Sequence, residues 1–125
     1  LNMEKVRPKL PESLIEGHLK EEELFQNMVL RPVIKMQHDV LILRVKSYFT
    51  SKRVMFNVMD KKKRTLAIEQ AFLGDNAFKK EIQGMILGQL NVDEFQGYLK
   101  NERSMNKRII QMVRNRMLDS LLELS

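Results

Sequence analysis

The stretch that most constrains the fold is residues 30–49, LRPVIKMQHDVLILRVKSYF. An α-helix advances by about 100° per residue, and at this spacing most apolar side chains of the stretch fall on one broad side. That side holds Leu30, Val33, Ile34, Val40, Leu41, Val45 and Tyr48. Such a wide apolar side is typical of a helix that is buried over more than half of its girth. We therefore predict one long central helix with shorter helices packed around it.

A proline marks where this helix should begin. Pro32 has no backbone N–H to donate, and it disfavours helical geometry at Arg31 before it. We therefore predict a kink or a break between Leu30 and Arg31, from which the main helix continues to Phe49.

The segments after residue 49 also show helical spacing, and several open on residues that favour a helix start. Asp60 and Asp75 are predicted N-caps, and Asn91 with Glu94 three residues later resembles a capping box. Alternating runs of β-branched residues between turns, the signal of strands, do not occur.

The sequence thus predicts an all-α fold. We expect a single compact bundle of about five or six helices in residues 21–125, preceded by an N-terminal arm in residues 1–20 that contains Pro8, Pro11 and Gly17.

The composition limits the classes of function. The chain has no cysteine, so disulfides, Cys-ligated zinc and thiol chemistry are excluded. The longest apolar run, residues 40–43, is far too short to span a bilayer, and the first residues lack the apolar core of a signal peptide. We expect a soluble, cytoplasmic protein with no membrane partner.

The positive charge is concentrated in one segment. The formal net charge is +6, which suggests an anionic partner, and residues 51–74 carry six basic and two acidic groups. Lys61, Lys62, Lys63 and Arg64 open a predicted helix, where positive charge is unfavourable against the helix dipole. A solvated face is the favoured interpretation, and contact with phosphate or RNA is the alternative.

Two polar residues interrupt the apolar side of residues 30–49. Gln37 and, seven residues later, Arg44 lie within it, and a guanidinium in a core requires an acceptor because an unpaired buried charge is very costly. The favoured interpretation pairs Arg44 with a carboxylate of another helix, the candidates being Glu69, Glu81, Glu94 and Asp119. The alternatives are an anionic ligand, or an exposed head group whose stem lies along the helix. We add Arg31 and Lys35 to the candidate binding residues.

Gly84 and Gly88 stand four residues apart, which puts them on one face of a predicted helix. Each glycine costs about 1 kcal/mol relative to alanine inside a helix, so close packing of another helix is the expected compensation. We predict that both lie at a close helix crossing within the chain. A homodimer contact and a ligand against bare backbone remain as alternatives.

No motif indicates catalysis, a cofactor or a metal. The two histidines, His18 and His38, stand in neither an HExxH nor a Glu-x-x-His motif. The side chains of His38 and Asp39 diverge by about 100° on a helix, so they do not form an acid–base pair.

A set of residues along the chain carries a family resemblance: Phe25-Gln26-Asn27, Leu30-Arg31-Pro32, Lys35, Gln37, Asp39, Gly84-Met85-Ile86-Leu87-Gly88 and Asn106-Lys107-Arg108. Over residues 22–118 the sequence resembles a family of small, uncharacterised, all-helical bacterial proteins. Some members carry a glyoxalase label, which implies a metal-dependent lyase acting on a hemithioacetal. That enzyme class is built on βαβββ modules with metal ligands on strands, and the sequence of this chain predicts no strand. The resemblance therefore implies no catalytic residue here.

Taken together, the residues favour a non-enzymatic helical domain that binds a protein partner or itself. The first alternative is a basic protein associated with nucleic acid, and the second is a glyoxalase-like enzyme that acts on a small molecule. An affinity for RNA or DNA that falls steeply with salt would favour the first alternative.

Overall fold

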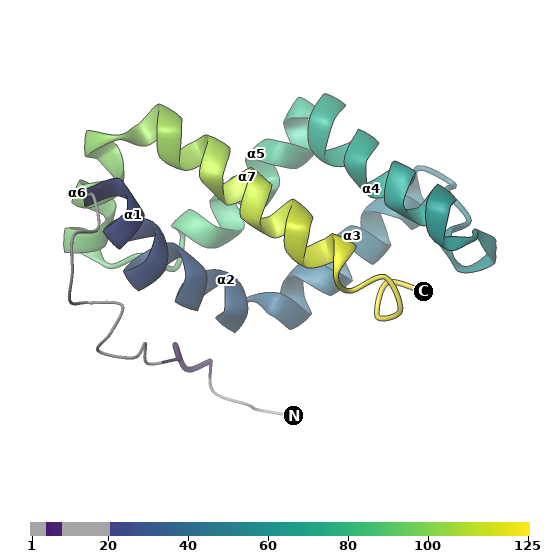
Figure 1. Ribbon diagram of the computed structural model, residues 1–125, viewed down its shortest axis with the longest axis horizontal. Coiled ribbons are helices and arrows are strands. Elements are labelled where there is room, and N and C mark those ends of the chain that lie inside the picture. Colours follow the sequence, from purple (N-terminus) through teal and green to yellow (C-terminus); the bar gives the residue numbers. More distant parts are fainter. Residues whose placement is uncertain (1–4, 9–20) are drawn as a thin grey trace.

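A computed structural model of the chain describes residues 5–8 and 21–125. Most of the predicted N-terminal arm, His18 included, lies outside these ranges. The elements, in chain order, are α1 (Glu21–Phe25), a π-helical segment (Gln26–Leu30), α2 (Arg31–Met36), α3 (His38–Ser51), a 3-10 turn (Phe56–Val58), α4 (Lys61–Gly74), α5 (Asn76–Leu87), α6 (Val92–Lys100) and α7 (Glu102–Leu118). No strand occurs within the described ranges, and the predicted all-α bundle is confirmed (Figure 1).

The predicted long helix is interrupted twice. Before Pro32 the backbone widens into a π turn, in which the Arg31 N–H bonds to the carbonyl of Gln26 five residues back. A wider turn relieves the clash that a proline ring makes with the carbonyl four residues before it. The second interruption was not predicted. Gln37, with φ −87° and ψ 5°, separates α2 from α3, and the two helices run in different directions (Figure 1).

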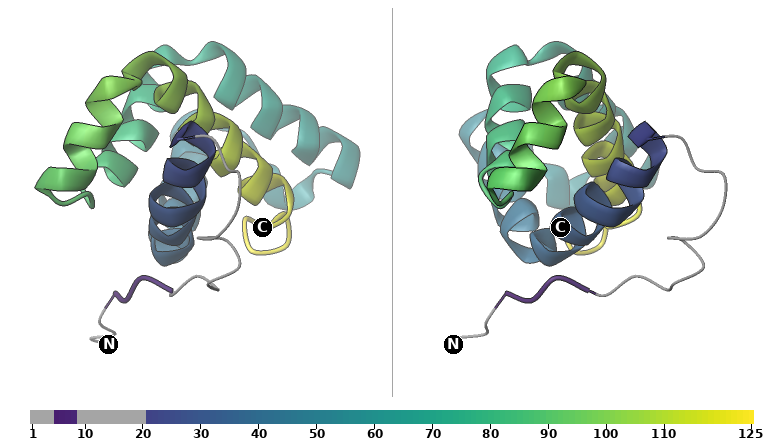
Figure 2. Two further views of the ribbon diagram at one scale, coloured as in Figure 1. Left: turned by 60° about the vertical axis from the view of Figure 1, so that its left-hand side comes forward. Right: turned by 90° about the vertical axis from the view of Figure 1, so that its left-hand side faces the viewer.

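The central helix is α7, and the prediction that residues 30–49 fill this role is wrong. α7 contacts α2, α4, α5 and α6, and the views in Figures 1 and 2 place it among them. Four of its side chains, spaced four residues apart, are at most 1% exposed: Met105, Ile109, Val113 and Met117. The bend at Gln37 divides the apolar side of residues 30–49 into two shorter faces, so neither α2 nor α3 can be surrounded in this way.

The predicted helix starts are confirmed. Asp60 accepts a hydrogen bond from the Lys63 N–H at 2.8 Å, and Asp75 accepts one from the Phe78 N–H at 3.0 Å. Asn91 and Glu94 form the reciprocal capping box, with each side chain accepting the backbone N–H of the other at 2.8 and 2.9 Å. These bonds satisfy N–H groups that a helix start leaves without partners.

The predicted helix crossing at Gly84 and Gly88 is wrong. Both glycines are exposed; a Cβ at Gly84 would meet no atom within 4 Å, and one at Gly88 would meet only the Gly84 carbonyl oxygen, at 3.1 Å. The reason is the register of α5, whose buried side holds Phe78, Ile82 and Ile86, two residues away from either glycine. A close approach occurs instead at Gly97, where a Cβ would lie 3.3 Å from the ring of Phe25.

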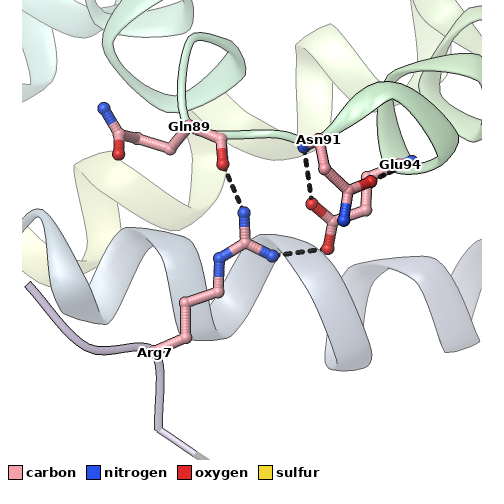
Figure 3. A network of polar contacts seen from close by, with 4 residues as sticks. All are labelled: Arg7, Gln89, Asn91 and Glu94. Carbon is pink, nitrogen blue, oxygen red and sulfur yellow. Dashed lines mark hydrogen bonds and ion pairs between the residues drawn. The ribbon is translucent and has the colours of Figure 1, made fainter.

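Within residues 5–8, the side chain of Arg7 reaches the corner between α5 and α6. The Arg7 guanidinium donates to the carbonyl oxygen of Gln89 and pairs with Glu94, which also accepts the N–H of Asn91 (Figure 3). Burial alone would raise the pKa of Glu94, but the hydrogen bonds from Arg7 and Asn91 outweigh it and lower that pKa. The contacts of Arg7 therefore stabilise the ionised carboxylate of the capping box.

Candidate binding groove

An open groove of about 590 Å³ runs between α2 and α7. Its lining contains four cationic side chains, Arg31 and Lys35 from α2 with Arg108 and Arg116 from α7, and one carboxylate, Asp119. We call this site the α2–α7 groove. Met112 supplies apolar surface between the charged groups, with Ile34 buried beneath, and side-chain amides are contributed by Gln26, Gln111 and Asn115.

Helix geometry explains why these side chains gather. Positions three and four residues apart lie on the same side of a helix, and Arg31, Lys35 and His38 follow this spacing on one side of the groove. Arg108, Met112 and Arg116 follow it on α7. On each helix the buried residues stand next to this polar row. The helices therefore pack through their apolar sides, and the two polar rows face each other across a cleft.

Two guanidinium groups in the groove are held in place through their Nε atoms. Arg31 Nε donates to Asn27 Oδ1, and Arg116 Nε donates to His38 Nδ1, both at 2.8 Å. No other described residue hydrogen-bonds to the terminal nitrogens of either side chain. Those nitrogens are therefore available to an anion, and two planar groups with restricted motion suit carboxylate or phosphate.

His38 positions Arg116 and is itself held by Glu123. Because an arginine Nε always carries a proton, His38 Nδ1 must accept this bond, which places the imidazole proton on Nε2. His38 Nε2 in turn contacts the carboxylate of Glu123. With both ring nitrogens engaged, His38 has no lone pair for a metal or a substrate proton in this arrangement. The described part of the chain contains no group of three or more His, Asp or Glu residues that could hold a metal.

The sequence identified only half of the cationic set. Arg31 and Lys35 were candidate binding residues, whereas Arg108 and Arg116 were not. Their spacing of eight residues on a helix with buried Met105 and Ile109 was the available signal, because it puts both on a polar side of α7. Nothing local in the sequence indicates that this side would face α2.

The other candidate binding residues do not line this groove, and Gln37 has a structural role. Its buried side chain donates from Nε2 to the carbonyl oxygen of Met85 at 3.1 Å, and it accepts from Lys5 Nζ at 2.7 Å. Met85 lies in the last turn of α5, where carbonyl groups lose their helical partners. Gln37 thus caps the C-terminal end of α5.

Arg44 has an internal partner. Its Nε lies 3.2 Å from Glu81 Oε1, and Glu81 was one of the four predicted carboxylates. The side chain of Arg44 is about one-third exposed, but its Nε is shielded from water and has no well-aligned hydrogen bond within the described residues. The geometry favours an intrachain ion pair over a ligand site at this position.

The basic cluster at the start of α4 contains one structural residue and three exposed ones. Arg64 donates to the carbonyl oxygens of Phe56 and Asn57, both at 3.0 Å, and lies over the Phe56 ring. It therefore joins the preceding turn to α4 and is a structural residue. Lys61, Lys62 and Lys63 are exposed.

Comparisons of the chain with protein-family models, with curated proteins and with solved structures give no match. The resemblance to a family of small bacterial proteins stays a prediction, and a function has to be inferred from the residues of this chain. Among the described helices, none combines the length and the apolar character needed to cross a bilayer.

Proposed function

We propose that this protein is a non-enzymatic interaction module whose α2–α7 groove binds an acidic segment of a partner protein. The observation that carries the proposal is the convergence of Arg31, Lys35, Arg108 and Arg116 on one cleft with a single carboxylate in its lining. None of these four cations forms an ion pair with a described Asp or Glu. An acidic ligand would supply the charges that the groove lacks.

The dimensions and lining suit a short peptide. From residue 108 to its end at residue 118, α7 extends about 15 Å at 1.5 Å per residue, which is about the length of four to five residues of extended chain. Met112, which is half-buried, can contact an apolar side chain, and the amides of Gln26, Gln111 and Asn115 can bond to a peptide backbone. A partner segment with acidic residues around one or two apolar residues would use all of these groups.

Nucleic acid is the first alternative partner. Single strands are commonly held by aromatic side chains on which bases stack, and none lines this groove. The second alternative is a glyoxalase-like enzyme, a class that uses metal ligands. His38, the histidine that the structure describes, is engaged at both ring nitrogens and has no lone pair for a metal. The proposal also covers self-association, in which the partner is a second copy of the chain. Sedimentation at several protein concentrations tests this form of it.

The test measures fluorescence anisotropy of a labelled peptide composed of glutamate and leucine. We expect the peptide to bind, and the double variant Lys35→Ala/Arg108→Ala to weaken binding about five- to tenfold, because each exposed charge contributes up to about 1 kcal/mol. The matched control is Lys46→Ala/Lys107→Ala, which removes the same charge from exposed positions outside the groove.

Equal losses in the two double variants would contradict the proposal, since they would show a response to net charge alone. Tighter binding of a single-stranded RNA than of the peptide, with a steep dependence on salt, would favour the nucleic-acid alternative.

A further inference from the structure

A second charged surface lies at one end of the molecule. It is formed by residues 52–66, which connect α3 to α4 and include the first turns of α4, and we call it the cationic tip. In Figure 1 the start of α4 and helix α6 mark opposite ends of the long axis. The tip exposes Lys52, Arg53, Lys61, Lys62 and Lys63, while its one acidic residue, Asp60, has its side chain occupied as the cap of α4.

The same tip exposes three aliphatic or thioether side chains. Met55 is 64% exposed, Val58 is 71% exposed and Leu66 is 53% exposed. They are not loosely held, because Phe56 between them is buried and stacks on Phe49 with ring centroids 5.0 Å apart. The tip therefore presents apolar side chains among cationic ones from a fixed backbone.

The stability of the fold does not explain why these residues occur in the cationic tip. Arg53 has φ 57° and occupies the left-handed position after α3, where the N–H of Val54 returns to Phe49 O and that of Arg53 to Thr50 O. Glycine is the usual residue at such a helix end, because a side chain there is strained. Three lysines in the first turn of α4 also oppose the helix dipole. Several locally unfavourable residues on one surface indicate that the surface has a function.

We propose that the cationic tip docks onto a membrane surface that contains anionic phospholipids. Ammonium and guanidinium groups would contact the phosphates and carboxylates of the head groups, while Met55 and Val58 would enter the boundary between head groups and acyl chains. Such docking departs from the expectation of no membrane partner, which rested on the absence of a membrane-spanning run; docking at the surface needs no such run. The apolar side chains decide against a nucleic-acid partner, whose backbone would use the charges and leave Met55 and Val58 in water.

The experiment is co-sedimentation of the full chain with vesicles of phosphatidylcholine mixed with phosphatidylserine, and with vesicles of phosphatidylcholine alone. We expect binding to the mixed vesicles only. Lys61→Glu/Lys62→Glu should weaken the partition coefficient at least about tenfold, and Met55→Ser/Val58→Ser, which keeps every charge, should weaken it several-fold. Acidic residues in the first turn of a helix are favourable, so unfolding would not explain the first loss.

Lys80→Glu/Lys107→Glu is the matched control, because it makes the same charge change at exposed positions outside the tip, and we expect it to bind nearly as well as the parent. Equal binding to both kinds of vesicle would overturn the proposal. An unchanged partition coefficient for Met55→Ser/Val58→Ser would also overturn it, and would do so in favour of nucleic acid if single-stranded RNA binds the parent and not Lys61→Glu/Lys62→Glu. None of these outcomes depends on the α2–α7 groove.

Discussion

At the scale of single residues, Gly84 lies on the exposed side of α5, where a methyl group would meet no other atom within 4 Å. Glycine in a helix interior is destabilising by about 0.5–1 kcal/mol relative to alanine. We therefore expect Gly84→Ala to raise the free energy of unfolding by about that amount, measured by urea denaturation. A decrease would show that the bare backbone at Gly84 serves a contact within the fold.

Gly97 provides the matched comparison, because it also lies inside a helix but beside the Phe25 ring. Gly97→Ala gains the same helix propensity and places its Cβ 3.3 Å from that ring. We expect a smaller gain than at Gly84 or a net loss, since overpacking opposes the gain.

Tyr48 makes a prediction about alkaline pH. Burial, the hydrogen bond to Asp75 at 2.8 Å and the negative charge of Asp75 raise the pKa of Tyr48 to about 12. Because an unfolded tyrosine has a pKa of about 10, the neutral phenol stabilises the folded state fully below about pH 10, and this contribution is lost as the pH rises towards about 12. We expect Tyr48→Phe to flatten the fall in stability over this window.

The ultraviolet absorbance of tyrosinate checks the same point. Burial also raises the pKa of Tyr98, so both tyrosines of the folded parent should ionise above pH 10. In Tyr48→Phe only the ionisation of Tyr98 should remain. A folded parent in which Tyr48 ionises near pH 10 would contradict this account.

At the scale of elements, the bend between α2 and α3 holds the end of α5 through Gln37. In Gln37→Leu the Met85 carbonyl would lose its partner in a partly buried place, which costs about 1–3 kcal/mol at most. Urea denaturation measures the loss. Lys5→Ala is the control, because it removes the other bond to Gln37 and leaves Met85 satisfied; its effect should stay within about 0.5 kcal/mol.

Elements were predictable from the sequence where their cause is local. Asp60, Asp75 and the pair Asn91 and Glu94 lie within three residues of the N–H groups that they cap, so the sequence contains both partners of each bond. The bend at Gln37 was not predictable in this way, since its amide bonds to a residue 48 positions away. For the same reason only half of the cationic set of the groove was predicted: the sequence shows a polar row on each helix, but only the packing shows that the two rows face each other.

At the scale of the whole molecule, burial is uneven along the chain. The inner side of α7 is at most 1% exposed, whereas no residue from 21 to 29 is buried. Amides that open only with the whole fold exchange hydrogen slowest. We expect the amides of residues 105–117 to exchange at the rate set by global unfolding and those of residues 21–29 to exchange faster. Slower exchange in residues 21–29 than in α7 would contradict the central position of α7.

The position of α7 in the sequence has a consequence for synthesis on the ribosome. Chains are made from the N-terminal end, so α2, α4 and α5 are complete before residues 102–118 appear. Until then the faces of these helices that pack against α7 are uncovered, and the core cannot close. A nascent chain of this protein therefore exposes the apolar faces of α2, α4 and α5 until α7 has been made, and the closing of this core is coupled to the synthesis of α7.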